Sequence, residues 1–381
     1  MLSYVFPGNI DTCIAKIGAE PIPYMRTDEF STINLESERI LLDLIHCKDG
    51  KTIIYTGSGT GAMAAIVENY ISTKQKAIVI NGGSFGKRWV SLCKYYNVPA
   101  IDFQIAFGKD IDYELLEKTI ETEQPDVFLC QHHETSTGVL YDLTKISEIC
   151  HRHNISLVVD VISSFLAENL NMDELGIDIC VTSTQKGLNV PPGLSIVFLS
   201  SRLNGYEFAH NGYYWDFQEN LDNLKRGQTP FSPATTIYLQ LHARLKQLEA
   251  QGGENQNIQE VHHRAEVFRE ECRKYGWAMP AERPSAAITA IQTKDTEKRN
   301  VFRGLIEKYD TYIMPGSIPG FYRISHMGLQ SDDELRELAQ HIHELETEEQ
   351  QSQKLSLTEP STCFTRGTSI FSDVPRNLVT I

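Results

Sequence analysis

Short apolar runs alternate with amphipathic stretches along most of the chain. Between residues 76 and 200 each apolar run is bounded by turn residues, and stretches with helical spacing separate the runs. The runs are KAIVING, PAIDFQ, DVFLCQHH, SLVVDV, DICVTST and SIVFLS, with YELLEKTIE and KISEICHRH among the helical stretches. This alternation predicts an α/β fold with a mostly parallel sheet covered by helices on both faces.

The pattern changes near residue 255. QLHARLKQLEAQGG, at 240–253, predicts a long helix that ends in a glycine pair, and helix, strand, helix, strand and helix follow. This order is typical of a smaller α+β domain of about a hundred residues. We therefore expect an N-terminal segment packed on the small domain, a large domain, the small C-terminal domain and an irregular tail. Their bounds are 1–29, 30–255, 256–347 and 348–381.

The two ends of the chain lack clear periodicity. The first forty residues look irregular because FPGN and EPIPY interrupt any helix, and helical spacing is visible only from residue 34 to 47. The tail 348–381 is rich in Ser and Thr and has no periodic pattern. We expect no regular structure in that tail.

Composition narrows the class of protein. The chain has 381 residues, 41% of them hydrophobic and 22% charged, as in ordinary globular proteins. A formal net charge of −15 argues against a nucleic-acid partner or an anionic membrane surface. No apolar run approaches the roughly 20 residues that span a bilayer, and no secretory signal is visible at the start. The 8 cysteines form no CxxC pair, so we expect no metal site, no disulfide framework and a cytoplasmic location.

Two polar residues follow buried strands in the middle of the chain. SLVVD ends in Asp160, and DICVTSTQK leads to Lys186. The carboxyl ends of parallel strands line the ligand crevice of an α/β sheet, so both side chains are expected to face one cavity. Alone, such an aspartate is most often a helix cap and such a lysine a surface charge. Their joint placement favours a catalytic lysine beside a carboxylate.

The segment VDVISSFLAENLNMDELGIDICVTSTQKGL resembles the class V aminotransferases of fold-type I, closest to those acting on 2-aminoethylphosphonate with pyruvate, or on alanine or serine with glyoxylate. The resemblance covers about residues 50–330 and implies pyridoxal 5′-phosphate as cofactor. It implies that Lys186 binds the cofactor covalently and moves the α-proton, and that Asp160 holds the ring nitrogen protonated. Ser163 and Gln185 are carried over as further cofactor contacts.

Two glycine-rich turns add candidates. TGSGTGAM opens a predicted helix, so its backbone N–H groups and hydroxyls can hold a phosphate, although a plain capped turn is the usual meaning of such a pattern. The resemblance assigns Ser58, Gly59 and Thr60 to the cofactor phosphate. In NGGSFGKRW it assigns Phe85 to stacking on the cofactor ring.

QHHETSTGV follows a buried strand and is similar to a family segment. Thr135 is expected to contact the cofactor, and Glu134 and Thr137 can reach the same crevice. His132 and His133 are adjacent on a strand and point to opposite faces, which disfavours joint metal ligation. We expect hydrogen-bonded histidines there.

The remaining candidates concern the substrate and a second subunit. RGQTPFSPATT resembles the family segment that reaches the partner's phosphate, which points to Thr229 and less directly to Arg226, and implies a homodimer with shared active sites. FYRISHMG resembles the carboxylate-binding segment and points to Arg323. MRTDEF departs from the family pattern, so no substrate role is assigned to Arg26.

The predicted function is transfer of an amino group from a small amine or amino acid, with 2-aminoethylphosphonate as one candidate, to a 2-oxo acid such as pyruvate or glyoxylate. Two alternatives stay open at this point. One is a lyase or epimerase that uses the same lysine and arginine. The other is a binding or regulatory protein on the same fold.

Overall fold

The computed structural model describes residues 1–295 and 300–358, with side chains described up to residue 348. A seven-stranded sheet in the order β2-β10-β9-β8-β5-β3-β4 forms the large domain. Its strands are β2 (Lys51–Thr56), β3 (Ala77–Asn81), β4 (Ala100–Gln104), β5 (Val127–Gln131), β8 (Ser156–Asp160), β9 (Ile179–Ser183) and β10 (Leu194–Leu199). Only β10 runs antiparallel to its neighbours. The predicted mostly parallel sheet is confirmed.

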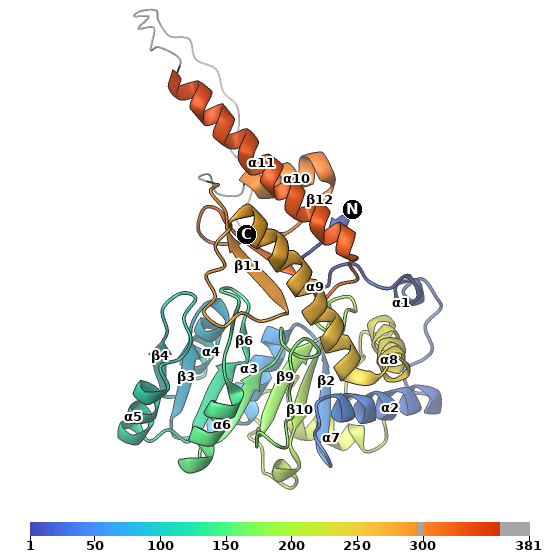
Figure 1. The fold of residues 1–381 in the computed structure, drawn as a ribbon. Helices are drawn as coiled ribbons and strands as arrows, with labels where there is room; N and C mark the ends of the chain where they lie inside the picture. The colour runs from blue at the N-terminus through green and yellow to red at the C-terminus, as the bar shows by residue number, and fades with distance from the viewer. Residues whose placement is uncertain (296–299, 359–381) are drawn as a thin grey trace, which may run out of the picture.

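Helices cover both faces of this sheet (Figure 1). Alternate residues of β5 face opposite cores: Val127 and Leu129 join one apolar cluster, and Phe128 and Cys130 join the other. Because both faces are buried, the strands read as continuous apolar runs. One cluster includes α2 (Asp28–Leu44), α5 (Tyr113–Glu123), α6 (Leu143–Arg152) and α8 (Thr235–Ala250), and the other α3 (Gly59–Asn69), α4 (Ser84–Tyr95) and α7 (Phe217–Leu224). Two short 3₁₀ helices, Ile71–Thr73 and Ser201–Leu203, and the hairpin of β6 (His133–Glu134) with β7 (Val139–Leu140) complete this domain.

The prediction that the first forty residues are irregular was wrong. A short helix, α1 (Thr12–Ile17), follows Asp11, whose side chain accepts a hydrogen bond from the backbone N–H of Cys13. α2 begins at Asp28, because the Thr27 hydroxyl caps its first turn and acidic residues at 28 and 29 favour a helix N-terminus. These capping residues were visible in the sequence, but the neighbouring prolines masked them.

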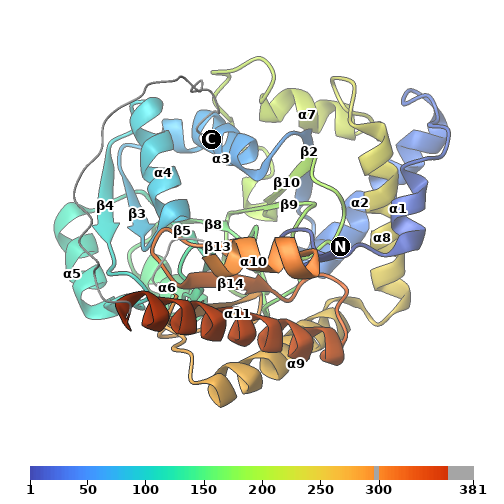
Figure 2. The same ribbon diagram turned by 90° about the horizontal axis from the view of Figure 1, so that it is seen from above.

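The small domain packs its helices on a three-stranded sheet of order β11-β14-β13. Its elements are α9 (Gly253–Tyr275), β11 (Ile288–Gln292), α10 (Asn300–Tyr309), β12 (Thr311–Tyr312), β13 (Met314–Pro315), β14 (Phe321–Ser325) and α11 (Asp332–Thr358). α9 and α11 lie side by side (Figure 2). Strand β1 (Leu2–Ser3) pairs with β12, so the N-terminus is attached to this domain. The structure contradicts the expected tail at its start, since α11 continues past residue 348 to Thr358; residues 359–381 lie outside the described residues.

A buried carboxylate joins the two domains. Glu168, in the loop after β8, accepts hydrogen bonds from the Ser285 hydroxyl at 2.6 Å and the Ala286 backbone N–H at 2.5 Å. Its other oxygen lies 3.2 Å from His262 Nε2 on α9. Burial alone raises the pKa of Glu168, but these partners outweigh it and the pKa is lowered overall. The carboxylate is therefore charged at neutral pH. It joins the large domain to two parts of the small domain, the segment of Ser285 and Ala286 and helix α9.

Replacing Glu168 with Ala should lower the free energy of unfolding by about 3 kcal/mol, because Ser285 and Ala286 lose the acceptor of charge-assisted hydrogen bonds. Urea unfolding followed by far-UV circular dichroism measures this loss. Glu121→Ala, at an exposed position of α5, is the matched control and should change stability by less than about 0.5 kcal/mol. Equal effects of the two substitutions would contradict a joining role for Glu168.

Candidate active site

Lys186 and Asp160 lie at the carboxyl ends of adjacent strands. Asp160 is the last residue of β8, and Lys186 comes soon after Ser183, the last residue of β9. The turn that begins at the lysine is closed by the Asn189 N–H, which donates to the Lys186 carbonyl. A Cβ on Gly187 would lie 2.0 Å from the carbonyl oxygen of Phe165, so only glycine lets the backbone approach so closely here. This turn holds Lys186 inside the protein, at 8% exposure, near Asp160 at 4%.

Burial dominates the electrostatics of this pair. It lowers the pKa of Lys186 to about 7, against the attraction of Asp160, and Arg323 and Arg88 lower it further. Burial likewise raises the pKa of Asp160 to about 7, although the Ile162 N–H, at 2.8 Å, and Lys186 favour the carboxylate. Lys186 therefore carries a substantial fraction of neutral, nucleophilic amine near neutral pH.

The glycine-rich turn opens α3 beside this pair. Ser58 is the N-cap residue, yet no described side chain caps the first turn by a hydrogen bond, and Gly59 and Thr60 begin the helix. Arg88 on α4 donates to the Thr60 hydroxyl at 2.8 Å, and its guanidinium lies 4.9 Å from the centre of the Phe85 ring. A helix N-terminus with hydroxyls and an arginine is suited to an anion. Arg88 was not predicted from the sequence, although its position three residues after Phe85 places both on one helix face.

Glu134 serves a purpose that the sequence did not reveal. Its carboxylate accepts hydrogen bonds from the backbone N–H groups of Phe85, at 3.2 Å, and Gly86, at 3.1 Å, in the first turn of α4. The Gln131 side chain and Ser136 donate to it as well. Glu134 is thus an acceptor for the N-terminus of α4 and fixes the position of Phe85.

Thr135 and Ser163 form a buried hydrogen-bonded pair. The Thr135 hydroxyl donates to Ser163 Oγ at 2.6 Å, and His133 Nδ1 lies 3.0 Å from the same atom. Burial lowers the pKa of His133 to about 3 and that of His132 to about 4, so both rings are neutral. His133 is hydrogen-bonded as expected, but each histidine leaves one buried ring nitrogen without a partner among the described atoms. The described residues contain no group suited to a metal ion.

Arg323 extends from β14 towards the large domain. It donates from Nη1 to the Thr135 carbonyl at 3.0 Å and from Nη2 to the Pro315 carbonyl at 3.2 Å. Its Nε is buried and has no partner within the described part of the chain. Burial lowers the pKa of Arg323, but an arginine stays charged, so a cation with spare donors faces the space near Lys186.

The other predicted residues are less closely joined to Lys186. Gln185 is half-buried in the turn before the lysine. Thr229 donates to the Phe231 carbonyl at 2.7 Å, and Arg226 is exposed and bonds Asn223, so a single chain brings neither residue to Lys186. Arg26 donates to the carbonyls of Thr229 and Pro230 and to Gln228, which makes it a support for that segment.

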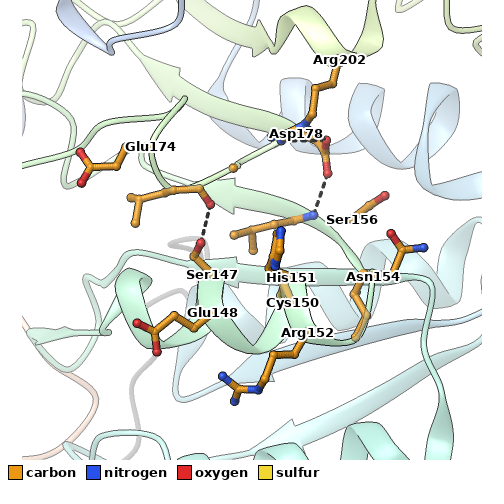
Figure 3. Close-up of a pocket in the computed structure, with 14 residues that line it drawn as sticks. Ser147, Glu148, Cys150, His151, Arg152, Asn154, Ser156, Glu174, Asp178 and Arg202 are labelled. Carbon is orange, nitrogen blue, oxygen red and sulfur yellow. Dashed lines mark hydrogen bonds and ion pairs between the residues drawn. The ribbon is translucent and has the colours of Figure 1, made fainter.

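A surface cavity of about 850 Å³ lies at the opposite end of the sheet, where β8 begins (Figure 3). Some of its polar side chains already have partners: Ser147 donates to the Leu175 carbonyl at 2.6 Å, and Asp178 accepts from Arg202 and from the Leu157 N–H. None of the predicted site residues lines this cavity. The candidate active site is therefore at the carboxyl ends of the strands.

The fold is that of the fold-type I aminotransferases. The solved alanine–glyoxylate aminotransferase from Nostoc sp. superposes with a TM-score of 0.84 at 22% identity, over 90% of this chain and 94% of that chain. The Aminotransferase class-V family model matches residues 24–303, and the chain belongs to this family. It is therefore an aminotransferase.

Curated relatives agree with this family. The serine–glyoxylate aminotransferase of Hyphomicrobium methylovorum is 28% identical over 341 residues, 85% of this chain and 84% of the relative. The 2-aminoethylphosphonate–pyruvate transaminase of Pseudomonas putida is 29% identical over 204 residues, 52% and 54% of the two chains. Among the helices in the described ranges, none is long and apolar enough to cross a membrane.

The lowered pKa of Lys186 predicts unusual reactivity in the cofactor-free protein. Because the neutral amine is the reactive form, its rate of reductive alkylation should rise with pH and level off just above pH 7. Peptide mass spectrometry after brief labelling measures the rate at each pH. Lys246 is an internal control: its hydrogen bonds to Glu36 and Glu249 raise its pKa, so its labelling should continue to rise at much higher pH. Parallel profiles for both lysines would refute the assignment.

Replacing Glu134 with Ala should weaken binding of pyridoxal phosphate, the cofactor that the family implies, about ten- to a hundredfold if Phe85 contacts it, because α4 loses the acceptor that fixes Phe85. The dissociation constant can be measured by titrating cofactor-free protein and following its visible absorbance. Glu148→Ala, exposed on α6, is the control and should leave the constant unchanged. An unchanged constant in the Glu134 variant would show that Phe85 does not depend on this carboxylate.

Proposed function

We propose that the cofactor is pyridoxal 5′-phosphate and that Lys186 binds it covalently. The carrying observation is a buried lysine whose pKa is lowered to about 7, beside a buried carboxylate, with Arg323 facing them. The donor set fits the group. Burial disfavours the charged form of Asp160, and the protonated ring nitrogen of pyridoxal phosphate would offset that cost. The N-terminus of α3, which has no side-chain cap, and the nearby Arg88 suit the phosphate group.

Each residue then has a defined task. When bound, pyridoxal phosphate withdraws electrons from the substrate's α-carbon and so makes proton removal there feasible. Lys186 Nζ takes up and returns that proton, which its lowered pKa permits near neutral pH. The phosphate is held by Ser58, Gly59, Thr60 and Gln185. Phe85 stacks on the cofactor ring, and Thr135 and Ser163 lie on the side of the ring that carries its hydroxyl oxygen.

Arg323 is the proposed carboxylate site. Its two carbonyl partners hold the guanidinium plane in place, and the free Nε–H leaves a donor for an incoming carboxylate. An α-amino acid donor and a 2-oxo acid acceptor both carry that group. The names of relatives include serine, glyoxylate, 2-aminoethylphosphonate and pyruvate, and we infer an acceptor of the glyoxylate or pyruvate type.

A homodimer is part of the proposal. Thr229 lines a small cavity together with Thr56, which comes two residues before Ser58. Arg26 donates a hydrogen bond to the Thr229 carbonyl and so supports the segment that contains Thr229. Such a supported surface segment suits contact with the phosphate of a second subunit. The cytoplasmic location remains a prediction.

A single-turnover absorbance scan tests the function. Cofactor-loaded protein is mixed with alanine, serine, aspartate, taurine or 2-aminoethylphosphonate, and pyruvate or glyoxylate is added afterwards. Transamination requires that a donor bleach the cofactor band and that the oxo acid restore it. Bleaching with ammonia release and no need for an oxo acid would instead support a lyase, and no response to any amine would support a binding protein.

Replacing Arg323 with Ala should raise the KM for carboxylate substrates about a hundredfold, because charge-assisted hydrogen bonds to the carboxylate are lost. Steady-state kinetics with the donor found above measures it. Arg152→Ala, exposed on α6, should leave KM unchanged. A fall in kcat with an unaltered KM would contradict a carboxylate-binding role.

A further inference from the structure

An aromatic ring from the N-terminal segment covers the catalytic lysine. Lys186 Nζ lies 3.2 Å from the centre of the Phe6 ring, which is direct contact with the ring face. Nothing in the sequence near FPGN indicates this contact. Because a substrate must react next to Nζ, Phe6 borders the space in which the reacting part of a substrate is held.

Phe6 is held in place from both sides of the site. The Asn189 side chain, in the turn that carries Lys186, donates to the Pro7 carbonyl at 2.8 Å and the Asn9 carbonyl at 3.2 Å. From β14, two residues after Arg323, the Ser325 N–H donates to the Tyr4 carbonyl at 2.8 Å. The segment is thus tied to the lysine turn and to the arginine strand.

A crossing of two glycines fixes the segment further. Gly8 has φ +80°, and a Cβ built on it would lie 2.8 Å from the Cα of Gly328. A Cβ on Gly328 would in turn lie 2.9 Å from the Cα of Gly8. Backbone therefore packs on backbone, next to the Leu329 N–H, which donates to the Asn9 carbonyl at 3.0 Å. The segment has little freedom to move away from Lys186.

The ring also has an apolar support behind it. Phe6 packs against a buried cluster drawn from both domains, so a shift of the ring would disturb the domain interface. The members of this cluster are Ala167, Val261, Ala265, Ala286, Ala287 and Met327. A rigid aromatic wall, unlike a mobile side chain, can reject groups by size.

The charges near Lys186 define what else a substrate can carry. In the described part of the chain, the cations that influence Lys186 are Arg323 and Arg88, and Arg88 is engaged with Thr60 on the phosphate side. One cation is thus left for the substrate, which suits a single carboxylate. A donor held by Arg323 at its carboxylate must fit its side chain beside the Phe6 ring.

We propose that Phe6 is a specificity-determining residue that limits the donor to small monocarboxylic α-amino acids, of the size of alanine or serine. The proposal rests on the proposed function, since it assumes that Arg323 holds the donor carboxylate. The N-terminal segment is therefore part of the active site.

The experiment compares wild type with Phe6→Ala on donors of increasing length: alanine, 2-aminobutyrate, norvaline and norleucine. The ratio of kcat/KM for norvaline to that for alanine should rise about tenfold or more in Phe6→Ala, since excluding a methylene or two is worth this much. Tyr95→Ala, which removes an exposed aromatic ring from α4, should leave the ratio unchanged. If Phe6→Ala does not fold, Phe6→Leu should give a smaller rise in the same direction. An unchanged ratio in a folded variant would overturn the proposal.

A second measurement does not require turnover. Unreactive monocarboxylates from propionate to hexanoate are titrated against cofactor-loaded protein and followed by the shift in visible absorbance. Phe6→Ala should lower the dissociation constant of hexanoate relative to that of propionate about tenfold. If wild type transaminates no amine but this shift appears, the proposed function fails and the size limit stands. If transamination occurs but neither the ratio of kcat/KM values nor the ratio of dissociation constants changes, the proposed role of Phe6 is refuted and the proposed function stands.

Discussion

The rest of the site depends on the burial of one amine. Lys186 lies within the protein beside an equally buried carboxylate, and moving either charge out of water is costly. The mutual attraction of Lys186 and Asp160 does not compensate fully, so burial governs both pKa values. The consequence is a nucleophile near neutral pH, which an exposed lysine cannot provide. The free-energy cost of burying both groups is tolerable only where the surrounding backbone is rigid. Asp160 ends the central strand β8, and Lys186 comes soon after the neighbouring strand β9.

One short segment after β5 transmits this rigidity to the other parts of the site. Glu134 anchors the first turn of α4, and the Thr135 hydroxyl reaches Ser163 in the loop after β8. The Thr135 carbonyl accepts from Arg323 of the small domain. The consecutive residues Glu134 and Thr135 thus position helix α4, the loop after β8 and the side chain of Arg323. A displacement at this segment would move the stacking ring, the cofactor support and the carboxylate site together.

Sequence patterns predicted those site residues whose positions depend on local structure. Asp160 and Lys186 were predictable because buried strands read as apolar runs whose polar ends are conspicuous. The glycine-rich turn that opens α3 was predictable from glycines before a helix, whereas the assignment of a carboxylate to Arg323 rests on its likeness to a family segment. Phe6 was not predictable, since its contact with Lys186 depends on a segment far away in the chain that is fixed by backbone hydrogen bonds and by the Gly8 crossing.

The proposed carboxylate site joins the two domains. Arg323 belongs to the small domain and donates to the Thr135 carbonyl of the large domain. Two of its five N–H groups are used for this and for Pro315, and those bonds fix the guanidinium plane. Because its orientation is set in advance, a carboxylate need not bear the entropic cost of ordering the side chain. Glu168 and the N-terminal segment hold the same two domains together at other points. The proposed donor specificity thus depends on side chains that the fold itself holds in position, with Arg323 at the carboxylate and Phe6 beside Lys186.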